Sequence, residues 1–220
     1  MSEVTIRGQS PFIKSRMKTT PIDNLQAQPS ETRTLRADAR RNVELLIAAA
    51  RAAFAAEGAN APLDDIARAA GVGSGTLYRH FPTRLALLEA VYRDSVERLC
   101  ADGERLAATE PPAEALIAWL HGFVRIVSEK RGLAAALSDE GRAQTLFGEC
   151  HAMINATGAS LLDRAKDAGA VRPEVPLGDL LKMAKAFANA AETSPEGSAL
   201  AERLLVLSMD GLRPRTSSPA

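Results

Sequence analysis

The chain has 220 residues, of which 46% are hydrophobic and 25% are charged, and its formal net charge at pH 7 is zero. These values are typical of a soluble globular protein with a sizeable core. No stretch of 18 apolar residues occurs and the N-terminus lacks the apolar segment of a signal peptide, so we expect neither a membrane-spanning nor a secreted protein. Aromatic residues make up only 4% and alanine-rich amphipathic runs are frequent, which favours an all-α fold.

Residues 1–33 contain scattered Ser, Thr, Gln and Pro without a hydrophobic period, which predicts a disordered N-terminal arm. Its five basic and three acidic residues would allow contacts with an anionic partner, although a solvated tail is the simpler interpretation. Residues 36–57 carry an apolar stripe at helical spacing and are followed by Gly58, which predicts a helix. Arg40 and Arg41 at its start are candidates for contacts with phosphate groups.

Residues 63–88 read LDDIARAAGVGSGTLYRHFPTRLALL, which predicts a short helix, a glycine turn, a second short helix and the start of a third. Gly71 suits the left-handed residue that ends a helix, and Pro82 suits the end of the second helix. In that second helix Leu77 and Phe81 share one side, whereas Gly75, Thr76 and Arg79 lie opposite. This order is typical of a helix-turn-helix, in which the second helix enters the major groove of DNA.

The side of the second helix that faces away from the core is small, polar and basic. Thr76 can contact a base or a phosphate, and Arg79 can bind guanine or grip a phosphate. Tyr78 and His80 flank this side with polar ends that can reach the sugar-phosphate backbone. Thr83 is expected to cap the next helix, at whose start Arg84 could help to hold a phosphate. From Ile66 to Arg84 there are three arginines and no acidic residue.

The G-T-L-Y-R-H-F sequence at residues 75–81, followed by Pro-Thr-Arg, resembles the N-terminal DNA-binding domain of the TetR family of transcriptional regulators. The resemblance covers about residues 38–99. The chain has Gly73 and Ser74 where Ser and Lys are commonest in that family, and Leu63 where a hydroxyl residue is usual. The resemblance implies DNA contacts at Leu63, Asp64, Ser74, Gly75, Thr76, Tyr78, Arg79, His80 and Arg84.

Beyond the motif, amphipathic segments separated by Gly, Pro or Ser predict further helices. Their expected ranges are 83–107, 113–130, 132–138, 139–168, 177–192 and 198–212. Such an order resembles the regulatory half of TetR-family proteins. We therefore expect a helix-turn-helix domain over residues 34–82, a regulatory and dimerisation domain over residues 83–212, and a disordered tail over residues 213–220.

Large side chains on two central helices of the second half could form the walls of an apolar ligand pocket. The candidates are Trp119, Phe123, Phe147, His151 and Met153, with Asn155 as a further hydrogen-bonding group. The alternative is that the aromatic residues and Met153 simply belong to the core.

Other kinds of site find little support in the sequence. A metal site would need His121, Glu149, Cys150 and His151 to converge from two helices that carry no His-x-x-x-His pair. A Cys-His hydrolase centred on adjacent residues is also disfavoured, because neighbours on a helix point about 100° apart. The glycines of residues 71–75 follow a helix rather than a strand and lack the lysine of a phosphate-binding loop. We predict no catalytic residues, metal or cofactor.

The expected protein is thus an all-α homodimeric transcriptional regulator, most simply a repressor of a palindromic DNA operator that responds to a small-molecule effector. The two cysteines form no C-x-x-C pair, which favours the cytoplasm. Two apolar helices over residues 177–192 and 198–212 are expected to pair with those of a second chain, the alternative being that they close the core of the monomer. A DNA-binding architectural dimer without an inducer is the competing function, and an enzyme is a third that no motif supports.

Overall fold

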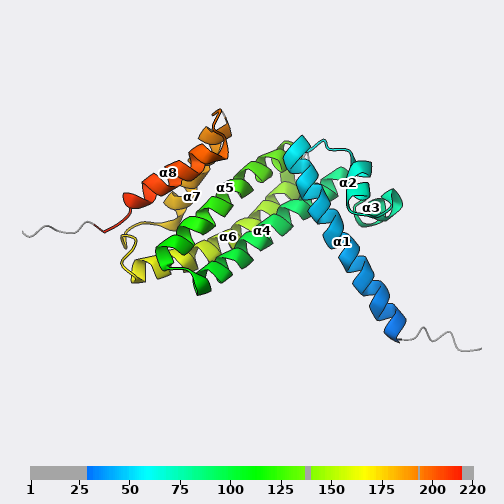
Figure 1. Ribbon diagram of the computed structural model, residues 1–220, viewed down its shortest axis with the longest axis horizontal. Coiled ribbons are helices and arrows are strands. Elements are labelled where there is room, and N and C mark those ends of the chain that lie inside the picture. The colour runs from blue at the N-terminus through cyan, green and yellow to red at the C-terminus, as the bar shows by residue number, and fades with distance from the viewer. Residues whose placement is uncertain (1–28, 137–139, 193, 215–220) are drawn as a thin grey trace, which may run out of the picture. The chain divides into compact units, whose positions relative to one another are not determined.

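The computed structural model describes residues 29–136, 140–192 and 194–214, and within them the chain forms eight helices and no strands (Figure 1). The prediction of an all-α fold is therefore confirmed. The helices are α1 Pro29–Glu57, α2 Leu63–Ala69, α3 Ser74–His80, α4 Arg84–Thr109, α5 Pro112–Ala136, α6 Glu140–Asp167, α7 Leu177–Glu192 and α8 Ser198–Asp210. None of the helices in these ranges is long and apolar enough to span a membrane.

Residues 1–38 and residues 39–220 form two compact units. In the first unit, the structure describes only the start of α1. This helix begins at Pro29, whereas the sequence predicted a start at Arg36. Residues 29–33, predicted to belong to a disordered arm, are therefore helical. Proline suits the first turn of a helix because its fixed φ is already helical and its missing N–H has no partner to lose there. Residues 1–28 of the predicted arm lie outside the described residues.

The first hydrophobic core of the second unit lies between α1, α2, α3 and the start of α4. It contains Leu46 of α1, Ile66 of α2 and Leu77 of α3, each no more than 1% exposed. The first turns of α4 complete it with Leu87 and Val91. The helix-turn-helix is thus fixed to α4 by hydrophobic burial, the main stabilising term in folding.

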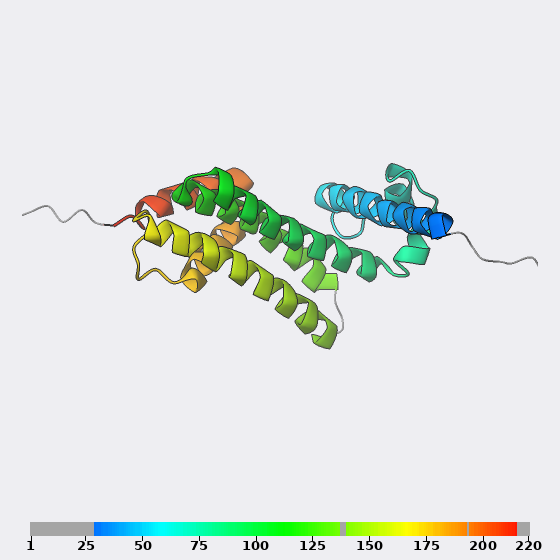
Figure 2. The same cartoon turned by 90° about the horizontal axis from the view of Figure 1, so that it is seen from below.

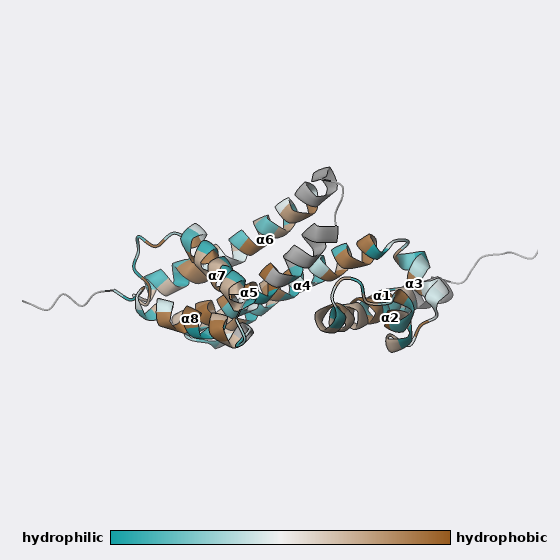
Figure 3. Ribbon diagram, turned by 90° about the horizontal axis from the view of Figure 1, so that it is seen from above, coloured by the Kyte–Doolittle hydropathy of each residue, from teal (hydrophilic) through white to brown (hydrophobic). Residues whose placement is uncertain are grey.

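The second core fills the space between α4, α5, α6, α7 and α8. Helices α4, α5 and α6 contact one another, α7 packs on α5 and α6, and α8 packs on α5 and α7 (Figures 1 and 2). Each helix combines hydrophobic and hydrophilic residues (Figure 3), so that one side can be buried. Trp119 of α5 is the largest fully buried side chain, and Gly103 of α4 and Gly158 of α6 leave room for its ring.

The predicted helix boundaries need one correction in this half. Residues 113–130 and 132–138 were expected to be separate helices, but α5 continues from Pro112 to Ala136 through Gly132. A glycine inside a helix costs only about 1 kcal/mol relative to alanine, which packing on α4, α6 and α7 can offset. Thr83 caps α4 as predicted, since its Oγ1 accepts a hydrogen bond from the backbone N of Ala86 at 3.1 Å. Residues 215–220 of the predicted tail lie outside the described residues.

Candidate DNA interface and ligand cavity

The turn between α2 and α3 is built on backbone geometry and two buried side chains. Gly71 has a φ of +71°, the left-handed conformation that glycine adopts without steric cost. The backbone N of Val72 donates to the carbonyl of Ala67 at 3.0 Å, which closes the end of α2. Ile66 and Leu77 then hold the two helices together from below. The turn therefore orients α3 firmly, with its opposite side toward solvent.

The solvent side of α3 carries the residues predicted to read DNA. Tyr78 is 47% exposed, Arg79 and Gly75 are exposed, and Thr76 and His80 are half-buried. Within the described chain Arg79 makes no ion pair, so its guanidinium is available to a ligand. A Cβ built on Gly75 would meet no atom within 4 Å, so the helix surface is open there. This side can approach the edges of bases in a major groove.

The two acidic residues at the start of α2 are both engaged. Ser74 Oγ donates to Asp64 Oδ1 at 2.7 Å, which ties the first turn of α3 to the first turn of α2. Arg68 and Asp65 form an ion pair of 2.8 Å one turn apart. Leu63 is half-buried against the first core. Of this group Asp64 and Ser74 therefore position α3, and Leu63 has no polar side-chain atom to offer to a phosphate.

Arg84, predicted at a phosphate site, has partners within the chain. Its Nη1 donates to the carbonyls of Ala59 and Ala61, at 3.0 and 2.5 Å, in the loop between α1 and α2. Hydrogen bonds from a charged donor are stronger than neutral ones, so this contact holds the loop to the start of α4. No local sequence pattern indicates these long-range bonds. Arg40 and Arg41 lie exposed on α1.

A cavity of about 480 Å³ lies between α4, α5, α6 and α7. Three of the predicted wall residues, Phe123, Phe147 and His151, line it, and so does Asn155. Trp119 and Met153 do not, because both pack into the second core. Sequence reasoning missed the polar lining residues that come from the other two helices, namely Tyr92 of α4 and Lys182 and Lys185 of α7.

The aromatic rings at this cavity are held by one another. Tyr92 and Phe147 meet edge to face with centroids 5.6 Å apart, and Trp119 stacks on Phe123 at 6.2 Å. Burial, more than the nearby charges, raises the pKa of the Tyr92 hydroxyl, which therefore stays neutral. Nδ2 of Asn155 lies 3.2 Å from Nδ1 of His151, which is one turn away on α6. The cavity thus offers an apolar interior, several neutral hydrogen-bonding groups and two cations from α7.

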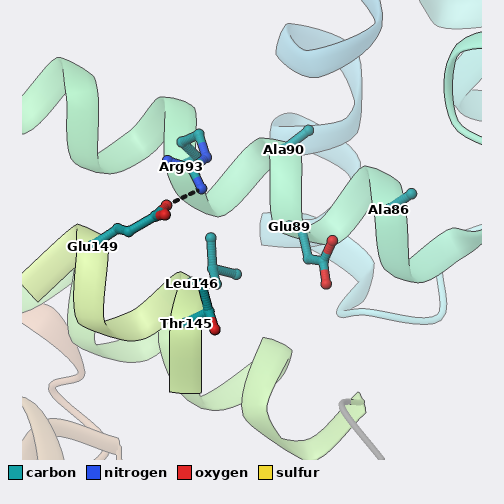
Figure 4. A pocket seen from close by; sticks show the side chains of 7 residues that line it. All are labelled: Ala86, Glu89, Ala90, Arg93, Thr145, Leu146 and Glu149. Carbon is teal, nitrogen blue, oxygen red and sulfur yellow. Dashed lines mark hydrogen bonds and ion pairs between the residues drawn. The ribbon is translucent and has the colours of Figure 1, made fainter. Parts of the chain in front are cut away.

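A second, more open hollow of about 510 Å³ lies between the start of α4 and α6 (Figure 4). Arg93 and Glu149 form an ion pair of 2.6 Å across it, and the hydrogen bond to Glu149 raises the pKa of Arg93. Glu149 is thus engaged with an arginine, and Cys150 is fully buried. Over the described residues no group of three or more His, Cys, Asp or Glu side chains could hold a metal ion.

The exposed recognition helix and the helical bundle that carries it define a helix-turn-helix DNA-binding protein. The profile of the bacterial regulatory proteins of the tetR family matches residues 46–91. That of the C-terminal domain of SbtR-like transcriptional regulators matches residues 111–214. The chain belongs to the TetR family of transcriptional regulators, as its sequence resemblance predicted, and these are regulators rather than enzymes.

Solved structures of other family members agree with this assignment. A TetR transcriptional regulator from Streptomyces coelicolor is 42% identical, with a TM-score of 0.69, over 79% of this chain and 99% of that protein. A TetR regulatory protein from Mycobacterium vanbaalenii is 38% identical, with a TM-score of 0.64, over 82% and 99%. The regulator LfrR from Mycobacterium smegmatis, solved in complex with proflavine, shares the fold at 21% identity and a TM-score of 0.54, over 80% and 98%. No curated protein matches the chain.

Proposed function

We propose that this DNA-binding regulator is a repressor that binds a palindromic operator in double-stranded DNA as a homodimer and leaves it when a small molecule binds. The observation that carries the proposal is the solvent side of α3, where Tyr78 and Arg79 are exposed above a fixed turn. Two such helices in a dimer would occupy half-sites about 34 to 36 Å apart. We also propose a cytoplasmic location, where a bacterial regulator of this family meets its DNA.

The proposed DNA contacts differ in kind. Thr76 and Arg79 would read base edges, while Arg40, Arg41, Tyr78 and His80 would bind phosphates or sugars. The remaining proposed contacts would act through the backbone, through close approach or by positioning α3, and they are Leu63, Asp64, Ser74, Gly75 and Arg84.

The test of base reading is Arg79→Ala. It should weaken binding to the selected operator by about 1 to 3 kcal/mol, because a bidentate contact to guanine is worth that much. Binding to random DNA should weaken much less, and the urea unfolding curve should not move, since Arg79 is exposed. Equal losses on operator and random DNA would contradict base reading and make Arg79 a phosphate contact. Operator DNA for this test comes from selection of a random pool with the purified protein.

We place the effector in the cavity between α4 and α7, against Phe123, Phe147 and His151, with Trp119 and Met153 supporting the walls from the core. The proflavine complex of LfrR is a case in which a protein of this fold holds an aromatic molecule. Tyr92 and Val91 are neighbours on α4, one lining the cavity and one in the first core. An effector that displaces Tyr92 would therefore shift the helix that carries α3.

The size of the effect follows from linkage. Each tenfold loss of operator affinity requires the effector to bind the DNA-free conformation about 1.4 kcal/mol more tightly than the DNA-bound one. A cavity with apolar walls favours this function over an architectural DNA-binding dimer, which would need no such space. Screening compounds for release of operator DNA separates the two. An architectural protein would keep its DNA with every compound that fills the cavity.

The proposed dimer interface is smaller than the one predicted from the sequence, which used both apolar helices over residues 177–192 and 198–212. Leu180, Leu181 and Leu205 are at most 7% exposed within one chain, so they serve the monomer core. Val206 and Leu207 of α8 are 49% and 63% exposed, and we propose that they pack against the same helix of a second chain. We keep the proposed division at residues 34–82 and 83–212, with the first turns of α4 contributing to both cores.

A further inference from the structure

A third cavity, of about 310 Å³, differs from the ligand cavity in being lined by charged groups of both signs. We call it the polar cavity, and it lies where α1, α4 and α5 meet. Arg51 comes from α1, Arg98 and Ser95 from α4, and Arg125 and Glu129 from α5. The proposed function uses none of these residues. Three helices thus bring three arginines to one hollow at the junction of the two cores.

The charges around the polar cavity leave an excess of positive charge. Arg51 and Arg98 both donate to the same oxygen, Oδ2 of Asp94, so one carboxylate serves two guanidinium groups. Arg125 adds a third cation and Glu129 a second anion. Asp102, also at the cavity, already pairs with Arg105 at 3.0 Å. Burial and the neighbouring charge of Arg98 lower the pKa of Arg51, and the charge of Glu129 opposes them only in part.

Several buried polar atoms here have no hydrogen-bond partner. Ser95 is 6% exposed, and its Oγ makes no hydrogen bond within the described structure. The Nε of Arg51 and Oε2 of Glu129 are also buried and without a partner there. Burying a polar group without a hydrogen-bond partner destabilises the folded state, so native proteins rarely keep such groups clustered. Two of these atoms can donate, and one can only accept.

We infer that the polar cavity binds a small oxyanion that carries a hydroxyl group, of which inorganic phosphate is the simplest. Its oxygens would accept from Ser95 Oγ, Arg51 Nε and the neighbouring guanidinium groups, which are donors of the kind that bind phosphate. Its hydroxyl would donate to Oε2 of Glu129, which a fully deprotonated anion such as sulfate cannot do. The polar cavity adjoins the apolar ligand cavity, since Ile126 lines both, but it takes a different chemical class of ligand.

Occupation of the polar cavity would affect how α1 is held. Arg51 links α1 to Asp94 of α4 through its Nη2, and an anion held by Nε would draw the same guanidinium away from Asp94. The anion would thereby loosen or reposition α1 relative to α4. The effect on operator affinity rests on the proposed function, but the binding itself does not. Binding is therefore measured without DNA, so that failure of one claim is distinguishable from failure of the other.

The experiment is isothermal titration calorimetry of the full-length protein with inorganic phosphate and, separately, with sulfate at equal ionic strength. Phosphate should bind, and sulfate should bind about tenfold more weakly, because it leaves Glu129 without a donor. Ser95→Ala should weaken phosphate binding about tenfold, whereas Ser208→Ala, whose Oγ bonds to Leu204 O on α8, should not.

A change of selectivity gives the sharpest readout. Glu129→Gln should remove the preference for phosphate over sulfate, because the amide of glutamine can donate to either ion. A ratio that stays at its wild-type value in Glu129→Gln would overturn the assignment. So would phosphate binding that Ser95→Ala leaves unchanged, since the ion would then lie elsewhere, or no binding of phosphate by a folded protein.

Discussion

The contact between Gly158 of α6 and the ring of Trp119 allows a stability prediction with an internal control. A Cβ on Gly158 would lie 2.6 Å from Cη2 and 3.0 Å from Cζ3 of Trp119. These distances are shorter than van der Waals contact, and overpacking of this kind costs about 1 to 3 kcal/mol. Gly148 lies on the same helix, and a Cβ there would meet nothing within 4 Å.

Both Gly→Ala changes gain helix propensity, about 1 kcal/mol each, and this gain cancels in the comparison. Gly148→Ala should raise the free energy of unfolding by about 1 kcal/mol, and Gly158→Ala should leave the protein about 1 to 3 kcal/mol less stable than Gly148→Ala. The assay is urea unfolding followed by far-ultraviolet circular dichroism at one fixed protein concentration, since a dimer's stability depends on concentration.

Trp119→Phe provides the second half of the test, because phenylalanine lacks the ring atoms that would clash. In that background the difference between the two Gly→Ala changes should shrink by about 1 kcal/mol or more, a coupling of the size expected for residues in contact. Equal shifts in unfolding free energy for Gly158→Ala and Gly148→Ala would refute the packing argument. A difference that persists unchanged in the Trp119→Phe background would assign the cost to another neighbour of Gly158.

Three further predictions concern the loop between α1 and α2, assembly and the effector. Arg84→Ala should lower the free energy of unfolding by about 2 kcal/mol, because two loop carbonyls lose a charged donor. The control Arg41→Ala should leave the free energy of unfolding unchanged. An unchanged urea midpoint for Arg84→Ala would contradict the loop contact. Leu207→Glu should dissociate the proposed dimer, so that sedimentation gives the 23.4 kDa monomer, while Glu202→Gln should leave the proposed dimer intact. Phe147→Trp should raise the effector concentration needed for DNA release, and release at the wild-type concentration would place the effector elsewhere.

The helix-turn-helix could be predicted closely because its determinants are local. The order of Gly71, Leu77 and Pro82 fixes where the helices end and which side of α3 is buried, and Leu77 is indeed fully buried while Tyr78 is exposed. Such features depend on residues a few positions apart. The role of Arg84 could not be predicted in the same way, since its partners in the α1–α2 loop lie more than 20 residues away.

The ligand cavity could be predicted only in part, for a related reason. Helical periodicity predicts that Phe123 and Trp119 both face the interior of the bundle. It cannot tell whether such a residue packs in the core or lines the cavity, because that depends on how the other helices pack. Trp119 is buried in the core because Gly103 of α4 and Gly158 of α6 leave space for its ring. Tyr92 and Lys182 reach the cavity from helices that are far apart in the sequence. No local pattern carries information of that kind.

The sharing of α4 between the two cores has a consequence for the construction of hybrid regulators. Leu87 and Val91 complete the core of the helix-turn-helix, whereas Tyr92, the next residue, belongs to the other core. A fragment that stops at Pro82 would leave Leu77 and Phe81 open to water and should not fold alone. A graft that moves this DNA specificity onto a different sensor should therefore join the two parents within α4, just beyond Val91.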